Sequence, residues 1–196
     1  MRILFVFFSY LFGSIPTGYL LYQRIKKKDI RQFGSKSMGA TNLLRLTDKK
    51  TALIAAFVDV LKGFVPVFLS LKLFDDLLFS LLCGFLAVLG HCFPLYIKFK
   101  GGKGVATTVG VYLALSLSSL LVLAVVFAAV IAITKYVSLG SLVSLMSLPL
   151  TALISGAEIE LVYFGVLIFA LIAFQHRENI KRLIQGQERK LGEKEA

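Results

Sequence analysis

Six apolar runs of 15 to 30 residues dominate this sequence, at 3–23, 51–73, 77–97, 105–134, 137–155 and 161–175. A helix rises about 1.5 Å per residue, so about 20 apolar residues cross a hydrocarbon core of roughly 30 Å. Strands of a membrane barrel would instead alternate over about 10 positions. With 57% hydrophobic residues and a mean hydropathy of +0.82, the chain has too much apolar surface for a soluble core. We therefore expect an all-α, polytopic membrane protein whose residues 1–196 form a single domain.

The fourth run is too long for one simple crossing. Its 30 residues would form a helix of about 45 Å. Ser116, Ser118 and Ser119 weaken its apolar pattern near the middle. The run is therefore either one strongly tilted helix or two shorter helices joined by a tight turn.

The distribution of positive charge favours two helices. If run 105–134 is split, 19 of the 22 lysine and arginine residues fall on one side of the membrane, in 24–50, 98–103, 135 and 177–196. Cytoplasmic loops carry such an excess of Lys and Arg. We expect seven transmembrane helices in the cell inner membrane, with the N-terminus outside and the C-terminus cytoplasmic. A signal peptide would have its cations before the first run, where only Arg2 stands, so we interpret that run as a retained helix.

Charged and thiol side chains within the runs have simple structural interpretations. Asp59 and Lys62 are three positions apart on one helix face. Charged residues inside a membrane are costly and often functional. A pair of opposite charges that neutralise each other is, however, a sufficient structural explanation for their presence. Cys83 and Cys92 are separated by about 13.5 Å of helix rise, which excludes a disulfide within that helix.

Three polar motifs interrupt the apolar pattern, and the expected topology places all three on the cytoplasmic side. The first is GSKSMGATNLLR, at 34–45. Its small residues allow a tight backbone, its hydroxyls add donors, and Arg45 can hold an oxyanion with two hydrogen bonds. This is the content of an anion site. The alternative is an ordinary loop that ends at a helix N-cap, Thr41 or Asn42.

The second motif is GHCFPLYIKFKGGKGVATT, at 90–108. It is not a nucleotide-binding P-loop, because Ile97 stands where that pattern needs glycine and Gly104 follows Lys103. Gly101, Gly102 and Gly104 surround Lys103 at the expected start of a helix at Val105. Free backbone donors at a helix N-terminus beside a lysine favour a phosphate. A topology signal alone would need the lysines but not three glycines.

The third motif is HRENIKRLIQGQE, at 176–188. His176 and Asn179 are three positions apart and share a helix face. A lone histidine where a span leaves the membrane is often only an interfacial residue.

Together these motifs, with GSIPTGYL at 13–20 and DVLKG at 59–63, resemble the bacterial integral-membrane acyl-phosphate:glycerol-3-phosphate acyltransferases, the PlsY family. The resemblance runs from the first expected helix to the last. One departure is GSKSMGATN, where the family often has GSGNIGATN, which leaves the roles of Lys36 and Ser37 open.

The resemblance implies transfer of a fatty acyl group from acyl phosphate to the sn-1 hydroxyl of glycerol 3-phosphate, which forms lysophosphatidic acid and phosphate, the first step of phospholipid synthesis. The enzyme that makes acyl phosphate is a further possible partner, beside the lipid bilayer. The resemblance implies catalytic roles for Ser35, Arg45, Lys103, His176 and Asn179. It implies substrate-binding roles for Gly39, Thr41, Asn42, His91, Gly101, Gly102, Gly104 and Thr107.

The residues favour direct attack on the acyl phosphate. The His-x-x-x-x-Asp pair of other glycerolipid acyltransferases is absent, because Tyr96 and Lys181 stand five positions after the two histidines. No serine or cysteine has an evident histidine and acid partner in the sequence. Catalysis can then rest on holding two anions side by side and stabilising the leaving phosphate. Which loop takes which phosphate, and whether His176 or a substrate phosphate accepts the proton, stay open.

Other classes fit less well. Topology signals explain the net charge of +11, so we expect no nucleic-acid partner. A membrane phosphotransferase would need clustered cytoplasmic aspartates for metal, whereas the loops offer Asp29 and Asp48, far from a cluster; we expect no metal and no cofactor. A permease for anions would need polar residues along several spans. The charges in the span interiors are instead limited to Asp59 and Lys62, which lie in one span.

Overall fold

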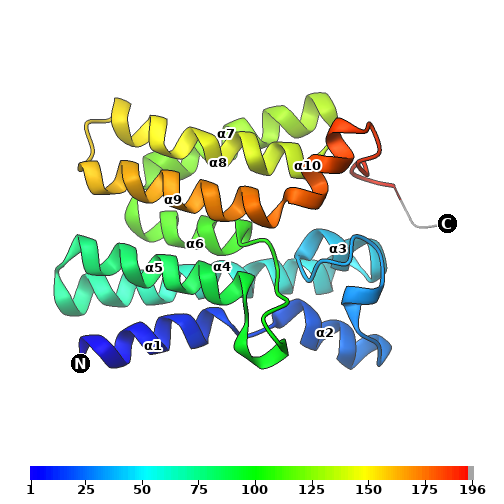
Figure 1. The fold of residues 1–196 in the computed structure, drawn as a ribbon, viewed down its shortest axis with the longest axis horizontal. Helices are drawn as coiled ribbons and strands as arrows, with labels where there is room; N and C mark the ends of the chain where they lie inside the picture. Colours follow the sequence, from blue (N-terminus) through cyan, green and yellow to red (C-terminus); the bar gives the residue numbers. More distant parts are fainter. Residues whose placement is uncertain (194–196) are drawn as a thin grey trace. The chain divides into compact units, whose positions relative to one another are not determined.

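The computed structural model describes residues 1–193, and every regular element within them is helical. Lys194, one of the C-terminal cations counted above, lies outside this part of the chain. The described residues form two compact units, Met1–Ala114 and Leu115–Glu193. Each unit has its own set of packed helices, which Figure 1 labels.

The first unit is built on three long segments. Helix α1 (Arg2–Gly13) packs along α5 (Leu77–Cys92), and α5 packs along α4 (Lys49–Phe74). Figure 1 shows these three helices running beside one another. The shorter elements of the unit are α2 (Thr17–Lys26), the 3-10 turns η1 (Ile30–Gln32) and η2 (Leu95–Ile97), α3 (Ala40–Leu46) and α6 (Val105–Leu115).

The first apolar run is interrupted, which the sequence reading as one continuous helix did not anticipate. Helix α1 ends at Gly13 and α2 begins at Thr17. Pro16 has no N–H to donate and forces the preceding residue away from helical geometry. At the break the carbonyl of Ile15 accepts the N–H of Thr17 at 3.0 Å in place of a helical hydrogen bond, and this carbonyl becomes part of the site described below.

Helices α4 and α6 approach closely through two glycines. A Cβ on Gly63 would lie 1.9 Å from the carbonyl oxygen of Thr107, and one on Gly110 would lie 1.8 Å from that of Val60. Any side chain at either position would collide with the opposing backbone. Small residues of this kind let membrane helices pack backbone to backbone, and here they seat the first turns of α6 against the middle of α4.

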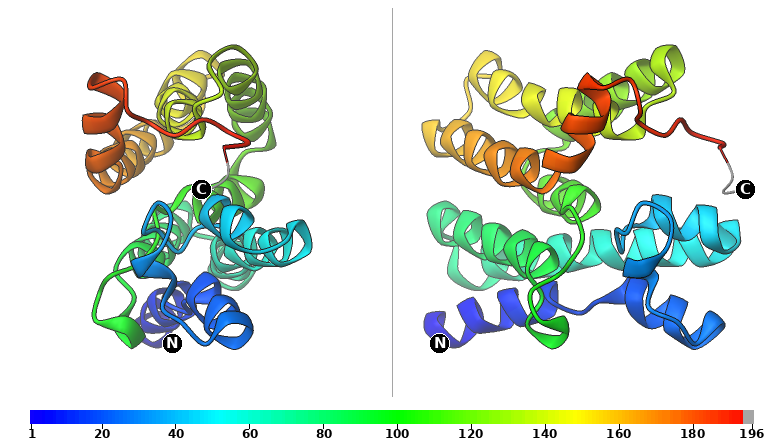
Figure 2. Two further views of the ribbon diagram at one scale, coloured as in Figure 1. Left: turned by 90° about the vertical axis from the view of Figure 1, so that its right-hand side faces the viewer. Right: turned by 45° about the vertical axis from the view of Figure 1, so that its right-hand side comes forward.

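The second unit contains α7 (Leu117–Thr134), α8 (Val137–Ile154), α9 (Ile159–Gln175) and α10 (Arg177–Ile184). Helix α8 packs against both α7 and α9, as the end-on view in Figure 2 illustrates. The axis bends by 67° between α9 and α10. Beyond this bend, α10 is in contact with both α8 and α9.

Five segments are long and apolar enough to cross a membrane, or six if α9 and α10 count as one bent span. Run 105–134 is divided at Ser116, whose side chain accepts a hydrogen bond from the Ser119 backbone and so caps α7. The division agrees with the two-helix reading, although α6 has only 11 residues. The count of seven spans and the orientation of the termini stay predictions.

Candidate active site

A buried ion pair lies beside the break between α1 and α2. The Nζ atom of Lys62 lies 2.5 Å from Asp59 Oδ1 and donates a second hydrogen bond to the carbonyl of Ile15, also 2.5 Å. The Lys62 and Asp59 side chains are 1% and 3% exposed. The expected pairing of these charges is therefore confirmed. Lys62 has an additional partner that the sequence did not reveal, the carbonyl of Ile15 just before Pro16.

His91 extends this cluster toward the glycine loop. Its Nδ1 atom lies 3.6 Å from Asp59 Oδ1, and the residue is buried near the end of α5. A small pocket is lined by the helix break, the ion pair and the first motif: Ser14, Ile15, Pro16, Thr17, Gly18, Met38, Asp59, Lys62, His91 and Pro94. The first and second motifs thus meet around one pocket of the first unit.

The loop of the first motif is folded around the side chain of Asn42. Asn42 Oδ1 accepts from the Ser35 backbone at 2.8 Å, and Asn42 Nδ2 donates to the carbonyls of Phe33 at 3.2 Å and Ser37 at 2.8 Å. The helix N-cap is Gly39, so the alternative of Thr41 or Asn42 as N-cap is wrong. The Asn42 side chain is turned back into the loop instead of capping α3. Its three hydrogen bonds make it a scaffold for the position of Ser35.

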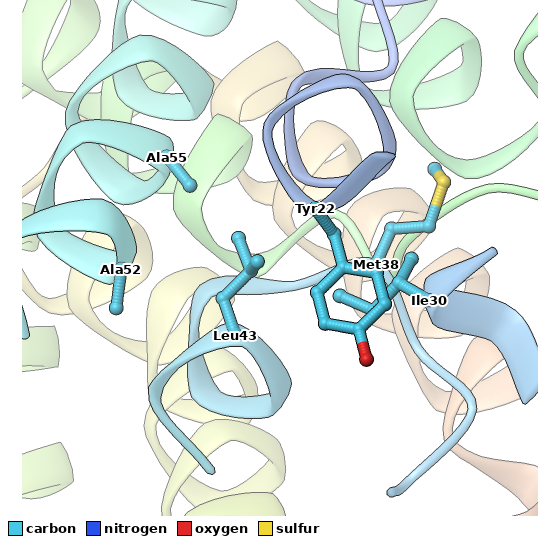
Figure 3. Packing of buried hydrophobic residues seen from close by; sticks show 6 residues of the cluster. All are labelled: Tyr22, Ile30, Met38, Leu43, Ala52 and Ala55. Carbon is cyan, nitrogen blue, oxygen red and sulfur yellow. The ribbon is translucent and has the colours of Figure 1, made fainter. Parts of the chain in front are cut away.

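Apolar residues anchor the same motif to the first unit. Met38 and Leu43 are buried in a cluster with Tyr22, Ile30, Ala52 and Ala55. Figure 3 shows Leu43 between the alanines of α4 and Tyr22, with Met38 and Ile30 on the far side of the tyrosine ring. Gly18 is required here, because a Cβ would lie 1.9 Å from the carbonyl of Met38. This apolar cluster anchors the segment that carries the half-buried site residues of the motif, Ser35, Gly39, Thr41 and Arg45.

The glycine loop folds back onto the end of α5. Gly101 donates its N–H to the carbonyl of Cys92 at 3.2 Å, and Gly102 donates to that of His91 at 3.0 Å. A Cβ on Gly102 would lie 2.1 Å from His91 Nε2. The expectation that these two glycines offer free amide donors needs correction, since both amides already close the turn. Donors for an anion must come from later residues, in the first turn of α6.

Helix α6 begins at Val105, as expected from the sequence. Gly104 before it has φ of +84°, a conformation that favours glycine. Lys103 is half-buried, whereas Lys98 and Lys100 are exposed. The hydroxyls of Thr107 and Thr108 are buried and make no hydrogen bond within residues 1–193. A lysine, a helix N-terminus and buried unsatisfied hydroxyls are features suited to a phosphate.

The third motif lies in the second unit. The Nδ1 atom of the buried His176 is 2.8 Å from the carbonyl of Ile172. A carbonyl only accepts, so Nδ1 carries the hydrogen, and Nε2 of the neutral ring is an acceptor. Asn179 is 5% exposed, and its Nδ2 donates to Glu188 Oε1 at 2.6 Å. The carbonyl oxygen of the Asn179 amide is left to accept a further hydrogen bond.

Glu188 belongs to the same hydrogen-bonded cluster, and the sequence analysis gave it no role of its own. Besides Asn179 it accepts from Ser138 Oγ at 2.7 Å and from Arg182 Nε at 2.8 Å. Burial by itself would raise the pKa of Glu188, but these three hydrogen bonds outweigh it and hold the pKa below its ordinary value. In the sequence it is the last residue of the third motif, an acidic residue among the cations that follow the last span.

Comparisons with known proteins give one consistent result. A family model described as glycerol-3-phosphate acyltransferase matches residues 3–186. The glycerol-3-phosphate acyltransferase of Endomicrobium trichonymphae is 41% identical over 191 residues, with 97% of this chain and 96% of that relative covered. That of Halalkalibacterium halodurans is 44% identical over 203 residues, with coverage of 97% and 96%.

Two solved structures are also similar. Both are crystal structures of PlsY (YgiH), described as an integral membrane glycerol 3-phosphate acyltransferase, and both are 38% identical to this chain. The glycerol 3-phosphate form has a TM-score of 0.93 and covers 97% of this chain and 96% of its own. The lysophosphatidic acid form has a TM-score of 0.90, with coverage of 97% and 95%.

Proposed function

Because this chain belongs to the PlsY family of glycerol-3-phosphate acyltransferases, and is therefore an acyltransferase of the membrane, we propose that its acyl donor is acyl phosphate. The acceptor is the sn-1 hydroxyl of glycerol 3-phosphate. The hydroxyl oxygen forms a bond to the acyl carbonyl carbon, and the bond from that carbon to the phosphate oxygen breaks. The products are lysophosphatidic acid and phosphate, which leaves with the bonding electron pair.

The observation that carries this proposal is the half-buried Lys103 at the start of α6, beside exposed Lys98 and Lys100. A lysine used only to orient the chain has no reason to be withdrawn from solvent. With the first-turn amides of α6 and the buried Thr107 hydroxyl, Lys103 can hold a phosphate and stabilise its charge as it leaves. Ser35 and Arg45 hold the phosphate at the other motif. Which substrate each loop takes stays open.

Attack proceeds directly, without a covalent acyl-enzyme. His176 Nδ1 bonds the backbone carbonyl of Ile172, whereas the corresponding nitrogen of a catalytic-triad histidine bonds a carboxylate. His91 does have an acid beside it, Asp59, but its Nε2 lies against the backbone of Gly102. His176 and Asn179 instead orient the glycerol hydroxyl. The proton goes to His176 Nε2 or to a phosphate oxygen of a substrate.

We further propose the arrangement in the membrane. Seven spans, with the N-terminus outside and the C-terminus inside, place all three motifs on the cytoplasmic side of the inner membrane, where soluble glycerol 3-phosphate is available. The break at Ser116 supports the division of run 105–134. Helix α6 has only 11 residues, which is short for a crossing. The non-helical segment just before it, which includes the buried Gly102 and Gly104, lies in the protein interior and adds to its length. Irregular backbone is tolerated there because it is covered by protein. Residues 1–196 act as a single domain.

The donor is tested with the purified protein in detergent or lipid nanodiscs. Glycerol 3-phosphate is supplied with either acyl phosphate or acyl-CoA, and lysophosphatidic acid and phosphate are measured. We expect both products from acyl phosphate. No product from acyl phosphate would overturn the proposal, and product from acyl-CoA alone would keep the enzyme class but replace the donor. In a second assay, the enzyme that makes acyl phosphate replaces added acyl phosphate, which tests whether that enzyme can supply the donor.

A further inference from the structure

A continuous series of contacts runs from the break in the first span to the glycine loop. Lys62 Nζ bonds the carbonyl of Ile15 and the carboxylate of Asp59, each at 2.5 Å. The same carboxylate oxygen lies 3.6 Å from His91 Nδ1. On the other side of the imidazole ring, Nε2 lies against Gly102, where an added Cβ would come within 2.1 Å.

We propose that Asp59 and Lys62 are positioning residues for the phosphate loop. They hold His91, and through it Gly102 and Lys103, in the geometry that binds a substrate phosphate. This inference rests on the proposed function, because it assigns the pair a task in the site around Lys103. It gives the DVLKG stretch at 59–63 a role beyond neutralising its own charges.

His91 is well placed to transmit the position of the pair. Its backbone carbonyl accepts the N–H of Gly102 at 3.0 Å, while its ring packs against the same glycine. The neighbouring carbonyl of Cys92 accepts the N–H of Gly101 at 3.2 Å. Gly102 is therefore held from two sides by one residue. A change in the His91 ring position displaces the backbone immediately before Lys103.

The other end of the loop rests on the same part of α4. Gly63, which directly follows Lys62, packs against the carbonyl of Thr107 in the first turn of α6. Asp59 and Gly63 lie one turn apart on the helix, so one turn of α4 supports both Gly102 and Thr107. The loop that carries Lys103 is thus supported at both ends by residues 59–63.

Helix packing alone does not require this pair. An apolar pair of similar volume is often as stable as a buried ion pair, because desolvation offsets most of the attraction between the charges. The carbonyl of Ile15 does not require the pair either, because it also accepts the N–H of Thr17 at 3.0 Å. What an apolar pair could not supply is a fixed charge facing His91 Nδ1, which sets the orientation of the ring.

The decisive variant is the double substitution Asp59→Asn with Lys62→Met, which removes both charges together and leaves no lone buried ion. We expect it to fold with a melting temperature near that of the wild type. We expect the KM for one phosphate-bearing substrate to rise about tenfold or more, since small displacements of binding groups have large kinetic effects, with a smaller fall in kcat. Asp59→Asn alone is expected to raise the same KM, and the two substitutions should not be additive.

A second readout does not depend on activity. Hydrogen exchange followed by mass spectrometry should show faster exchange in the double variant for peptides covering 98–107, where the amides of Gly101 and Gly102 are now held. Peptides from α7 should be unchanged. The matched control is Ser70→Ala, which removes a buried hydroxyl from the same helix. It should leave both the KM values and the exchange of 98–107 as in the wild type.

The outcomes separate this inference from the proposed function. If the wild type makes no lysophosphatidic acid from acyl phosphate, the proposed function fails, while the exchange of 98–107 still tests the positioning. If the wild type is active and the folded double variant has unchanged KM values and unchanged exchange, the positioning role is overturned and the proposed function stands. A fall in melting temperature with unchanged KM and exchange also overturns it, because the pair then contributes only stability.

Discussion

Three lysines of the glycine loop have different surroundings. Lys98 and Lys100 are exposed, whereas Lys103 is half-buried next to two buried glycines. Each glycine nearby has its own physical reason. Gly102 leaves room for the ring of His91, and Gly104 adopts a positive φ before α6. We therefore propose that Lys98 and Lys100 serve the orientation of the chain and that Lys103 serves the site.

We expect Lys103→Ala and Arg45→Ala each to lower turnover by about a hundredfold or more, because each removes a charge that holds or stabilises phosphate. The variants should still insert into the membrane, since neither side chain is part of an apolar span. The assay is lysophosphatidic acid formation by purified protein. Lys100→Ala and Lys50→Ala, which truncate exposed lysines, are the matched controls and should be near wild type. A near wild-type rate for either site variant would remove that residue from the mechanism.

At the scale of single elements, the first motif depends on one asparagine. Asn42 is 1% exposed and bonds three backbone groups of the loop before α3. Removing it leaves these groups without partners, at about 1–3 kcal/mol for each group that water cannot reach. The loop is short, so its conformation and the position of Ser35 depend on the same side chain.

Asn42→Ala should therefore lower the free energy of unfolding by about 2 kcal/mol and raise the KM for a phosphate-bearing substrate. Thermal unfolding and steady-state kinetics measure the two effects. Gln32→Ala, an exposed amide in the preceding turn, is the control for side-chain truncation in this segment. An Asn42→Ala variant with wild-type stability and kinetics would contradict the scaffold role.

Glu188 connects α10 to the start of α8 in the second unit, through Ser138 on one helix and Asn179 and Arg182 on the other. The pKa of Glu188 in the folded chain lies below its ordinary value of 4.5. A carboxyl with a lowered folded-state pKa contributes stability above its unfolded pKa, and this contribution is lost as pH falls through the folded value. The contribution is thus fully present at neutral pH.

Glu188→Gln should lower the melting temperature at pH 7, and the difference from the wild type should shrink as the pH falls below about 4.5. The measurement is the melting temperature of both proteins between pH 7 and pH 3. Glu178→Gln, an exposed acid on α10, serves as the control. A difference that is independent of pH would mean that the Glu188 carboxylate does not provide this stability.

At the scale of the whole molecule, the number of crossings decides which loops share a membrane side. A single crossing of run 105–134 would export the residues after α9, whereas two crossings keep them in the cytoplasm. Ser155 and Gln187 lie at exposed positions on either side of α9. Labelling of cysteines placed there distinguishes the two arrangements, because native Cys83 and Cys92 are buried.

With seven spans, Ser155→Cys should react with a membrane-impermeant maleimide from outside, and Gln187→Cys only after the cytoplasmic side is opened. Right-side-out membrane vesicles, intact and permeabilised, provide the two conditions. The unsubstituted chain is the control for background labelling of the native thiols. The reverse pattern would establish a single crossing of 105–134 and overturn the proposed topology.

Much of the helical pattern could be predicted from the sequence. The runs at 51–73, 77–97 and 137–155 match α4, α5 with its following turn, and α8 to within a few residues. The serines at 116–119 marked the break before α7. The break at Pro16 was missed, because the flanking residues are apolar enough to read as one run. Glu188 was missed because its role depends on Ser138, 50 residues away.

The membrane class and the approximate helix bounds can be predicted from local sequence, since the bilayer demands about 20 apolar residues per crossing whatever packs beside them. The motif around Lys103 could also be recognised in the sequence, because glycines and a lysine before a helix are typical of a phosphate-binding loop. The partners of buried polar groups, in contrast, depend on how the helices pack. Lys62 meets the carbonyl of Ile15, and His91 meets Gly102, because helix packing brings together residues that no local pattern connects.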